Sequence, residues 1–279
     1  MKIDLHLHSL YSDGLKSPRE LCVLAKKAKL SLLALTDHDT VAGLEDMRAA
    51  AMETNLPQPL DGVELSCGEG GRIHVLGYGP ALRSGTLSDY LESARQKRLA
   101  RVREMLRVLA AMGLPVEEAA LPLDGARPVG RAHVARAMVA AGHVKTVKQA
   151  FDQYLGASKP ANIPMQRLSA AEAAHMLRQL GAVPVLAHPL RVGLSLETLA
   201  QLLPELQAAG LLGMEVYHSS CNARAARQLD AMARTRGLLV TGGSDYHGDA
   251  DKNVHVGQLP GSWARMAEDA EALLRAAGV

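Results

Sequence analysis

The sequence contains few aromatic residues and few cysteines, and each shortage limits the kind of protein it can encode. Phe, Tyr and Trp make up 3% of its 279 residues, with one Trp and one Phe. The core must therefore be built from Leu, Val, Ala and Met, which suits α/β packing. Three cysteines, Cys22, Cys67 and Cys221, lie far apart and form no Cys-x-x-Cys pair. This spacing indicates reduced thiols rather than a disulfide framework or a structural zinc ribbon.

Long apolar runs and a strong net charge are also missing. No uninterrupted apolar run approaches the roughly 20 residues that span a bilayer, and the first residues lack an apolar secretory core. The 31 Lys and Arg residues nearly balance 29 Asp and Glu, for a net charge of +2. Proteins that bind long nucleic acids or anionic membranes carry more basic charge. We expect a cytoplasmic protein without a membrane or long nucleic-acid partner, and the sequence leaves its oligomeric state open.

Short apolar runs alternate with helical segments along most of the chain. The predicted strands cover residues 2–7, 32–35, 58–65, 73–77, 183–187, 213–216 and 238–241, and the predicted helices cover 17–29, 40–55, 170–180, 196–209, 223–236 and 263–279. Two helices open with capping boxes, Ser17 with Glu20 and Ser169 with Glu172. This alternation predicts a parallel sheet, and the chain length fits a single α/β barrel.

Residues 88–166 break this alternation and contain no convincing strand. Apolar residues between Leu91 and Leu109 recur at helical spacing and predict one long amphipathic helix within a helical insertion. The basic residues of this helix are Arg95, Lys97, Arg98, Arg101 and Arg103. Because they are spread around the helix, we interpret them as a solvated face rather than a ligand surface.

Side chains that bind metals follow the predicted strands. His6 and His8 alternate along the first strand and so point the same way, although such a pair is common in a chain with 11 histidines. The same residue types recur at the ends of later strands, where an α/β barrel places its chemistry. The candidate ligands are His6, His8, Asp13, His38, Glu64, His74, His188, Asp245 and His247.

This set is larger than one tetrahedral zinc ion uses, so it predicts a multinuclear centre. Mixed imidazole and carboxylate ligands suit Mn²⁺, Fe²⁺ or Zn²⁺. Two ions about 3.5–4 Å apart are typical of phosphatases and nucleases. The residues therefore favour metal-assisted hydrolysis.

The order of these motifs resembles the polymerase and histidinol phosphatase (PHP) superfamily. The matching motifs are His6-x-His8, Asp13-Gly14, Thr36-Asp37-His38-Asp39, Glu64, His74, His188-Pro189 and Ser244-Asp245-x-His247. The resemblance implies a distorted (β/α)7 TIM-like barrel formed by residues 1–87 and 167–279. It also implies that residues 88–166 form an inserted helical substrate-binding subdomain.

The resemblance implies two to three divalent ions, with Mn²⁺ expected first. His6, His8, Glu64 and Asp245 would hold one ion, Glu64 would bridge to a second held by His74 and His188, and Asp13, His38 and His247 would hold a third. Some relatives have His in place of Asp13, which leaves the occupancy of the third position open. We expect Asp37 and Asp39 to orient ligating imidazoles from outside the metal shell.

The segment 128–135 resembles small bacterial phosphoesterases that act on nucleotides, including 3′,5′-nucleoside bisphosphate phosphatases. This resemblance implies a phosphatase in which a hydroxide generated at the ions attacks the 3′-phosphate. Arg131 and His133, at a predicted helix start, are expected to bind a second phosphate of the substrate. Lys159, Arg191 and His218 are further candidates.

Three other functions stay open on the sequence. Two are catalytic: a histidinol-phosphate phosphatase and a 5′-3′ exonuclease acting on short oligoribonucleotides. The third is a metal-binding domain without catalytic activity, although every expected ligand position is filled.

Overall fold

A computed structural model describes residues 1–123, 129–248, 254–259 and 263–279. Its strands are β1 (Ile3–Leu7), β2 (Leu32–Leu35), β3 (Leu60–Cys67), β4 (Ile73–Tyr78), β5 (Val183–Leu186), β6 (Gly213–His218) and β7 (Leu239–Gly243). The helices are α1 (Pro18–Ala28), α2 (Leu44–Thr54), α3 (Gly85–Ala111), α4 (Arg131–Ala140), α5 (Val147–Ala150), α6 (Ala170–Gln179), α7 (Leu196–Ala208), α8 (Ala223–Thr235) and α9 (Trp263–Ala277). Short helical turns are η1 (Glu69–Gly71), η2 (Pro80–Arg83), η3 (Glu118–Ala120) and the π-helical η4 (Phe151–Leu155).

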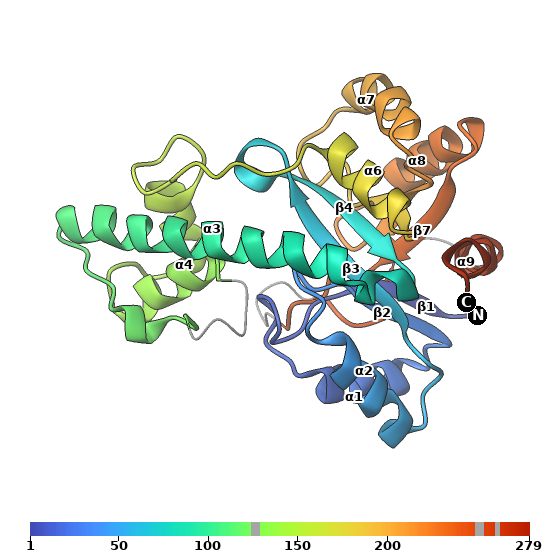
Figure 1. The fold of residues 1–279 in the computed structure, drawn as a ribbon, viewed down its shortest axis with the longest axis horizontal. Coiled ribbons are helices and arrows are strands. Elements are labelled where there is room, and N and C mark those ends of the chain that lie inside the picture. Colours follow the sequence, from blue (N-terminus) through green and yellow to red (C-terminus); the bar gives the residue numbers. More distant parts are fainter. Residues whose placement is uncertain (124–128, 249–253, 260–262) are drawn as a thin grey trace.

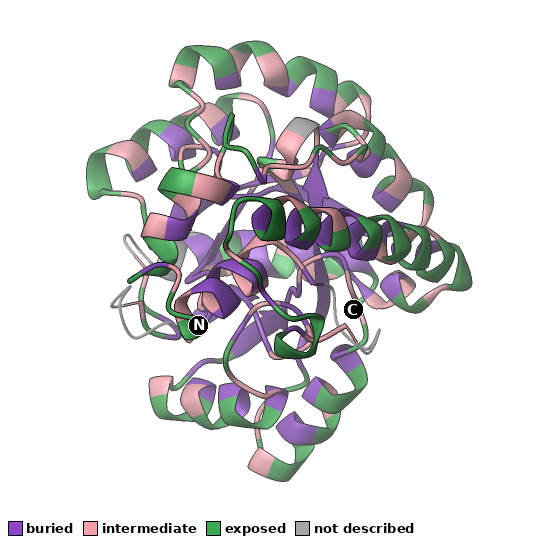
Figure 2. Cartoon of the chain, turned by 90° about the vertical axis from the view of Figure 1, so that its left-hand side faces the viewer, coloured by how far each residue is buried: buried purple, intermediate pink, exposed green. Residues whose placement is uncertain are grey.

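The strands form one sheet in chain order, from β1 to β7, and its centre is uniformly buried beneath the surrounding helices (Figure 2). The prediction of a wholly parallel sheet is wrong at β4, which runs antiparallel to both β3 and β5. Only the short turn η1 separates β3 from β4, and a parallel crossover needs a dozen residues or more. The reversal brings the first residues of β4 to the end of the barrel where the other strands finish.

Backbone bonds between the first and last strands nearly close the sheet into a barrel. The amide of His8 donates to the carbonyl of Tyr246 at 3.0 Å, and the amide of Asp245 donates to the carbonyl of His6 at 2.9 Å. Gly243 permits this approach, because a Cβ atom there would lie 2.0 Å from the Cβ of His6. The predicted distorted seven-stranded α/β barrel is confirmed.

Helix α3 runs from the barrel into the helical lobe beside it (Figure 1) and contributes residues to two separate hydrophobic clusters. Leu87 and Leu91, near its beginning, belong to the barrel core. Val102 and Leu109, farther along, pack with Met138 of α4 in the core of a helical lobe. This lobe, which we call the insertion, contains no strand in its described residues. The boundary expected at residue 88 thus lies within a continuous helix.

Local sequence features explain where most helices begin. Ser17 and Ser169 form the predicted capping boxes at α1 and α6. Helix α2 begins at Leu44, with Gly43 at its N-cap, rather than at the expected residue 40. Before it, the chain still follows the sheet, since the amide of Asp39 donates to the carbonyl of Glu64. Within the described ranges, no helix combines the length and the apolarity needed to cross a bilayer. Pro128, part of the segment that carried the nucleotide-phosphoesterase resemblance, lies outside the described residues.

Candidate metal centre and anion pocket

Glu64 of β3 is the centre of the histidine cluster at the end of the barrel. The following contacts surround its fully buried carboxylate. One oxygen, Oε1, lies 2.7 Å from His74 Nδ1 and 2.9 Å from His188 Nε2; the other, Oε2, lies 3.1 Å from His6 Nε2, 3.2 Å from His8 Nε2 and 3.1 Å from His38 Nδ1. His74 reaches this position because β4 is antiparallel. A carboxylate with five imidazoles around it has the placement of a bridging metal ligand.

Asp245 and Asp13 extend the cluster on its other sides. Asp245 Oδ1 lies 3.1 Å from His8 Nε2, and Asp13 Oδ1 lies 3.3 Å from His247 Nε2. Asp245 adopts a positive φ of 53°, an uncommon conformation for a residue with a side chain and one that is concentrated at functional sites. Ligand atoms within 4.8 Å of one another form the groups His6, His8, Glu64 and Asp245; His8, Asp13, His38 and His247; His38, Glu64 and His74; and His6, His188 and Glu215.

These groups bring together all nine predicted ligands. The first group contains the residues expected to hold the first ion, and the second contains the three expected at the third ion, joined by His8. His74 and His188, expected at the second ion, both contact the same oxygen of Glu64. We therefore keep the predicted assignment of ligands to three ions as a proposal.

The donor atoms of the cluster fit divalent cations. Buried atoms without a hydrogen-bond partner among the described residues include His6 Nε2, both ring nitrogens of His8, Asp13 Oδ1, His38 Nδ1, Glu64 Oε2, His188 Nδ1 and Asp245 Oδ1. A buried polar atom without a partner costs on the order of 1–3 kcal/mol. So many in one cluster require a common partner, and nitrogen and carboxylate donors suit Mn²⁺, Fe²⁺ or Zn²⁺.

Electrostatics keep the central carboxylate ionised. Burial opposes ionisation of Glu64, but His38, His6 and His74 outweigh it and hold its pKa well below the ordinary value. Burial likewise opposes the charged form of His6, yet the carboxylates of Glu64 and Glu215 raise its pKa to about 10. The two carboxylates therefore favour the protonated form of the His6 ring.

Sequence reasoning missed Glu215, a buried residue of β6. The Nδ1 of His6 lies 3.0 Å from Glu215 Oε1, and the amide of His188 donates to Glu215 Oε2 at 2.8 Å. A carboxylate on the second nitrogen of a ligating imidazole fixes the ring and increases its basicity. The detectable signal was a glutamate inside the apolar run predicted as the sixth strand.

Asp37 and Asp39 do not have the expected role. Asp37 accepts hydrogen bonds from Ser9 and Ser12, and Asp39 accepts from the amide of Ser66 and from Arg98. Among the described residues neither carboxylate has a hydrogen bond to an imidazole. These aspartates shape loops beside the cluster rather than orient its rings.

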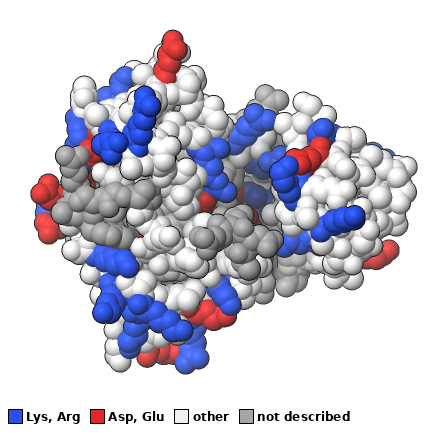
Figure 3. Space-filling model, turned by 180° about the vertical axis from the view of Figure 1, so that it is seen from behind, with Lys and Arg blue, Asp and Glu red and all other residues white. Residues whose placement is uncertain are grey.

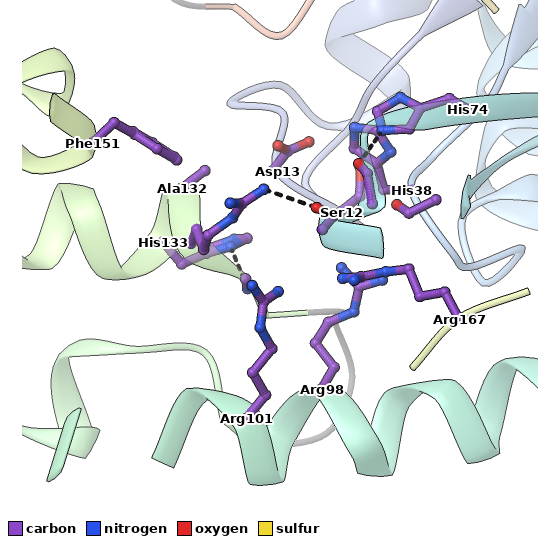
Figure 4. A pocket seen from close by; sticks show the side chains of 15 residues that line it. Ser12, Asp13, His38, His74, Arg98, Arg101, Ala132, His133, Phe151 and Arg167 are labelled. Carbon is purple, nitrogen blue, oxygen red and sulfur yellow. Dashed lines mark hydrogen bonds between the residues drawn. The ribbon is translucent and has the colours of Figure 1, made fainter. Parts of the chain in front are cut away.

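A cavity of about 220 Å³ opens beside the cluster, between the barrel and the insertion (Figure 4). It is lined by Ser12, Asp13, His38, Ser66, Gly70, Gly71, His74, Arg98, Arg101, Gly130, Arg131, Ala132, His133, Phe151 and Arg167. We call this cavity the anion pocket. Figure 3 shows Lys and Arg side chains gathered on both sides of the hollow that separates the two parts of the molecule.

The interpretation of the basic α3 residues as a solvated face is wrong for Arg98 and Arg101. They are 9% and 6% exposed, because this side of α3 faces the barrel and the rest of the insertion. Arg98 Nε and Arg101 Nη2 are buried without hydrogen-bond partners among the described residues. Lys97 and Arg103 are exposed as expected.

Crowding of positive charge makes the anion pocket attractive to an anion. Burial, followed by repulsion from Arg167, lowers the pKa of Arg98 to about 10. Burial and repulsion from Arg167, Arg131 and Arg98 lower the pKa of Arg101 to about 9. A phosphate group would satisfy the free donors and relieve this repulsion, since guanidinium and phosphate form charge-assisted hydrogen bonds.

The predicted substrate residues fall into three places. Arg131 and His133, in the first turn of α4, line the anion pocket as expected. Arg191 and His218 contact Asp245 at the metal cluster instead. Lys159 is exposed and does not line the pocket. Arg167, which precedes α6, lines both this pocket and a second hollow, and no motif had singled it out.

Sequence comparisons agree with this architecture. The family model of the PHP domain matches residues 4–164. A Chromobacterium violaceum protein named 3′,5′-nucleoside bisphosphate phosphatase is 35% identical over 264 residues, covering 92% of each chain. A Haemophilus influenzae protein named 5′-3′ exoribonuclease is 33% identical over 254 residues, covering 88% of this chain and 90% of its own.

Two solved structures share the whole fold. A Chromobacterium violaceum protein described as an amidohydrolase with bound sulfate is 32% identical, with a TM-score of 0.86 over 98% of this chain and 97% of its own. A Bifidobacterium adolescentis protein described as a metal-dependent phosphoesterase is 30% identical, with a TM-score of 0.84 over 98% of this chain and 96% of its own. With the family model matching more than half of its length and relatives spanning nearly all of it, the chain belongs to the PHP domain family.

Proposed function

We propose that this PHP phosphoesterase removes the 3′-phosphate of 3′,5′-nucleoside bisphosphates and releases a 5′-nucleotide. One observation carries the proposal: the anion pocket, with its four arginines, lies directly beside the metal cluster and shares Asp13, His38 and His74 with it. A substrate with two phosphates would place one at each position. The name of the Chromobacterium violaceum relative supports the same substrate class.

The metal cluster would hold the phosphate that reacts. Its ions, with Mn²⁺ proposed first, would polarise the phosphate and lower the pKa of a water molecule. Glu64 holds His6, His8 and His38 around one oxygen and His74 and His188 around the other. Arg191 reaches Asp245 at the edge of the cluster and would bind a non-bridging phosphate oxygen.

The anion pocket would hold the 5′-phosphate. Arg98 and Arg101 offer buried donors, and Arg131 stands at the start of α4, where the helix dipole also favours an anion. Phe151 lines the same pocket, and the centre of its ring lies 5.9 Å from the guanidinium carbon of Arg131. Holding one phosphate away from the reaction orients the other toward the cluster.

The test compares phosphate release from adenosine 3′,5′-bisphosphate and adenosine 3′-phosphate in the presence of Mn²⁺. The wild-type protein should show a much higher kcat/KM on the bisphosphate. Arg131→Ala should lower kcat/KM far more on the bisphosphate than on the 3′-phosphate. Equal activities of the wild-type protein, or equal losses in the variant, would contradict the proposal.

The same two positions suit a second candidate, removal of the first nucleotide from a 5′-phosphorylated oligoribonucleotide. The 5′-phosphate would occupy the anion pocket and the first phosphodiester would lie at the metal cluster. The Haemophilus influenzae relative is named for such an activity. A comparison of kcat/KM on the bisphosphate with kcat/KM on 5′-phosphorylated dimers to pentamers decides which substrate is preferred. The cationic pocket disfavours histidinol phosphate, whose organic part is itself cationic.

A further inference from the structure

We propose that the insertion controls a metal position: Arg136 and Arg98 hold the two barrel loops that present Asp13 and His38, so retention of the third ion depends on these arginines. The first contact comes from α4. The Nη1 and Nη2 atoms of Arg136 donate to the backbone oxygen of Asp13 at 3.2 and 3.1 Å. Arg136 does not line the anion pocket, so this contact concerns the loop rather than the substrate.

The second contact comes from α3. Arg98 donates to the carboxylate of Asp39, the residue that follows His38. Asp39 has a positive φ of 50°, which is costly for a residue with a side chain and must be imposed by its surroundings. Its carboxylate also accepts from the amide of Ser66 at 2.9 Å. The Arg98 contact therefore helps to hold the turn that places His38 beside Glu64.

Several of the other ligands are held by the barrel itself. His6, Glu64 and His74 lie within strands, and the amide of Asp245 is bonded to β1. The side chains of His6 and Glu64 are completely buried and that of His74 is 16% exposed, whereas those of Asp13 and His38 are 22% and 18% exposed. The third position is thus built on loops at the rim of the barrel, where the insertion touches it.

This inference rests on the proposed metal centre and not on the identity of the substrate. Supporting contacts outside the ligand shell typically change metal affinity by about 10–100-fold. We expect Arg136→Met to raise the Kd of the Mn²⁺ ion at the third position by at least about tenfold, with the other ions unaffected. Arg136→Lys, which keeps one donor, should show a smaller effect.

The experiment measures Mn²⁺ bound per chain by equilibrium dialysis over a range of free Mn²⁺, followed by mass-spectrometric metal analysis. The Asp13→Ala variant lacks a ligand of the third position, so the ion that it loses is the one bound there. Arg107→Met, on an exposed arginine of α3 paired with Glu104, is the matched control and should bind Mn²⁺ as the wild-type protein does. Asp39→Asn tests the same dependence from the barrel side, should Arg136→Met fail to fold.

Selective weakening of the ion lost in Asp13→Ala, by Arg136→Met or Asp39→Asn, supports the inference. Unchanged binding in both, equal weakening of every ion, or an Asp13→Ala protein that loses no ion would overturn it. Phosphate release from the two adenosine substrates is measured separately on the wild-type protein. The inference about the third ion and the proposed substrate are therefore tested by separate measurements, and either can be contradicted without the other.

Discussion

Glu215 and His6 form a buried pair in which Oε1 of the carboxylate lies 3.0 Å from Nδ1 of the imidazole. The other carboxylate oxygen accepts a hydrogen bond from the amide of His188. Glu215 of β6 therefore supports two candidate ligands, His6 in β1 and His188 in the loop after β5. The pair leaves the Nε2 atom of His6 directed at Glu64, 3.1 Å away. Glu215 thus determines which nitrogen of His6 is offered to an ion.

Glu215→Gln should weaken Mn²⁺ binding by about 10–100-fold. A side-chain amide is a poorer hydrogen-bond acceptor than a carboxylate, so the His6 imidazole would become less basic and a weaker metal ligand. Competition with a fluorescent chelator measures the affinity. Glu205→Gln, on the exposed surface of α7, is the control. A Glu215→Gln protein with the affinity of wild type would show that the pair does not support the ion.

Uptake of metal should release a proton from His6. Glu64 and Glu215 outweigh the effect of burial and raise its pKa to about 10, so the metal-free protein carries the imidazolium at neutral pH. An ion binds only the neutral ring, so affinity should increase as pH rises toward the pKa. Titration calorimetry at pH 7.5 in two buffers of different ionisation enthalpy measures the released proton. Identical enthalpies in the two buffers would contradict this prediction.

Arg101→Gln should lower kcat/KM on the bisphosphate by about 10–100-fold, the effect of losing a charged hydrogen bond worth about 1.5–3 kcal/mol. The loss on a substrate with a single phosphate should be much smaller. Lys97→Gln removes a positive charge from an exposed position on the same helix and serves as the control. Similar losses in both variants would indicate a general electrostatic effect instead of a specific contact.

Gly243→Ala should destabilise the protein and disturb the metal centre together. A Cβ atom there would lie 2.0 Å from the Cβ and 2.6 Å from the backbone nitrogen of His6, so β7 and β1 must separate. Overpacking of this kind costs about 1–3 kcal/mol. Thermal unfolding with and without Mn²⁺ measures both effects. Gly85→Ala, whose Cβ would meet no atom within 4 Å, should leave both unchanged.

Much of the barrel and its ligands could be predicted because each follows from local pattern. The alternation at His6 and His8 and the recurrence of ionisable residues at strand ends are properties of the sequence itself. The direction of β4 was missed because an apolar run does not show which way a strand runs. Only the shortness of the turn before β4 indicates that it is antiparallel to β3.

The contacts of the insertion could not be predicted for a different reason. The α3 arginines look alike in sequence, and burial of Arg98 and Arg101 depends on how the helix rotates against the barrel. Arg136 meets the backbone of Asp13, which no side-chain pattern reveals. Glu215 was open to prediction from its place within an apolar run, whereas the pairing of Asp39 with Arg98 depends on the fold.

Closure of the barrel between β7 and β1 also sets the order in which the protein can acquire its metal. His6 and His8 are translated before Asp245, which follows His8 by 237 residues and shares one ligand group with them. A growing chain therefore carries imidazoles without the carboxylate that completes their group. This group can capture an ion in the proposed geometry only after β7 has docked against β1, so loading of this position follows closure of the barrel.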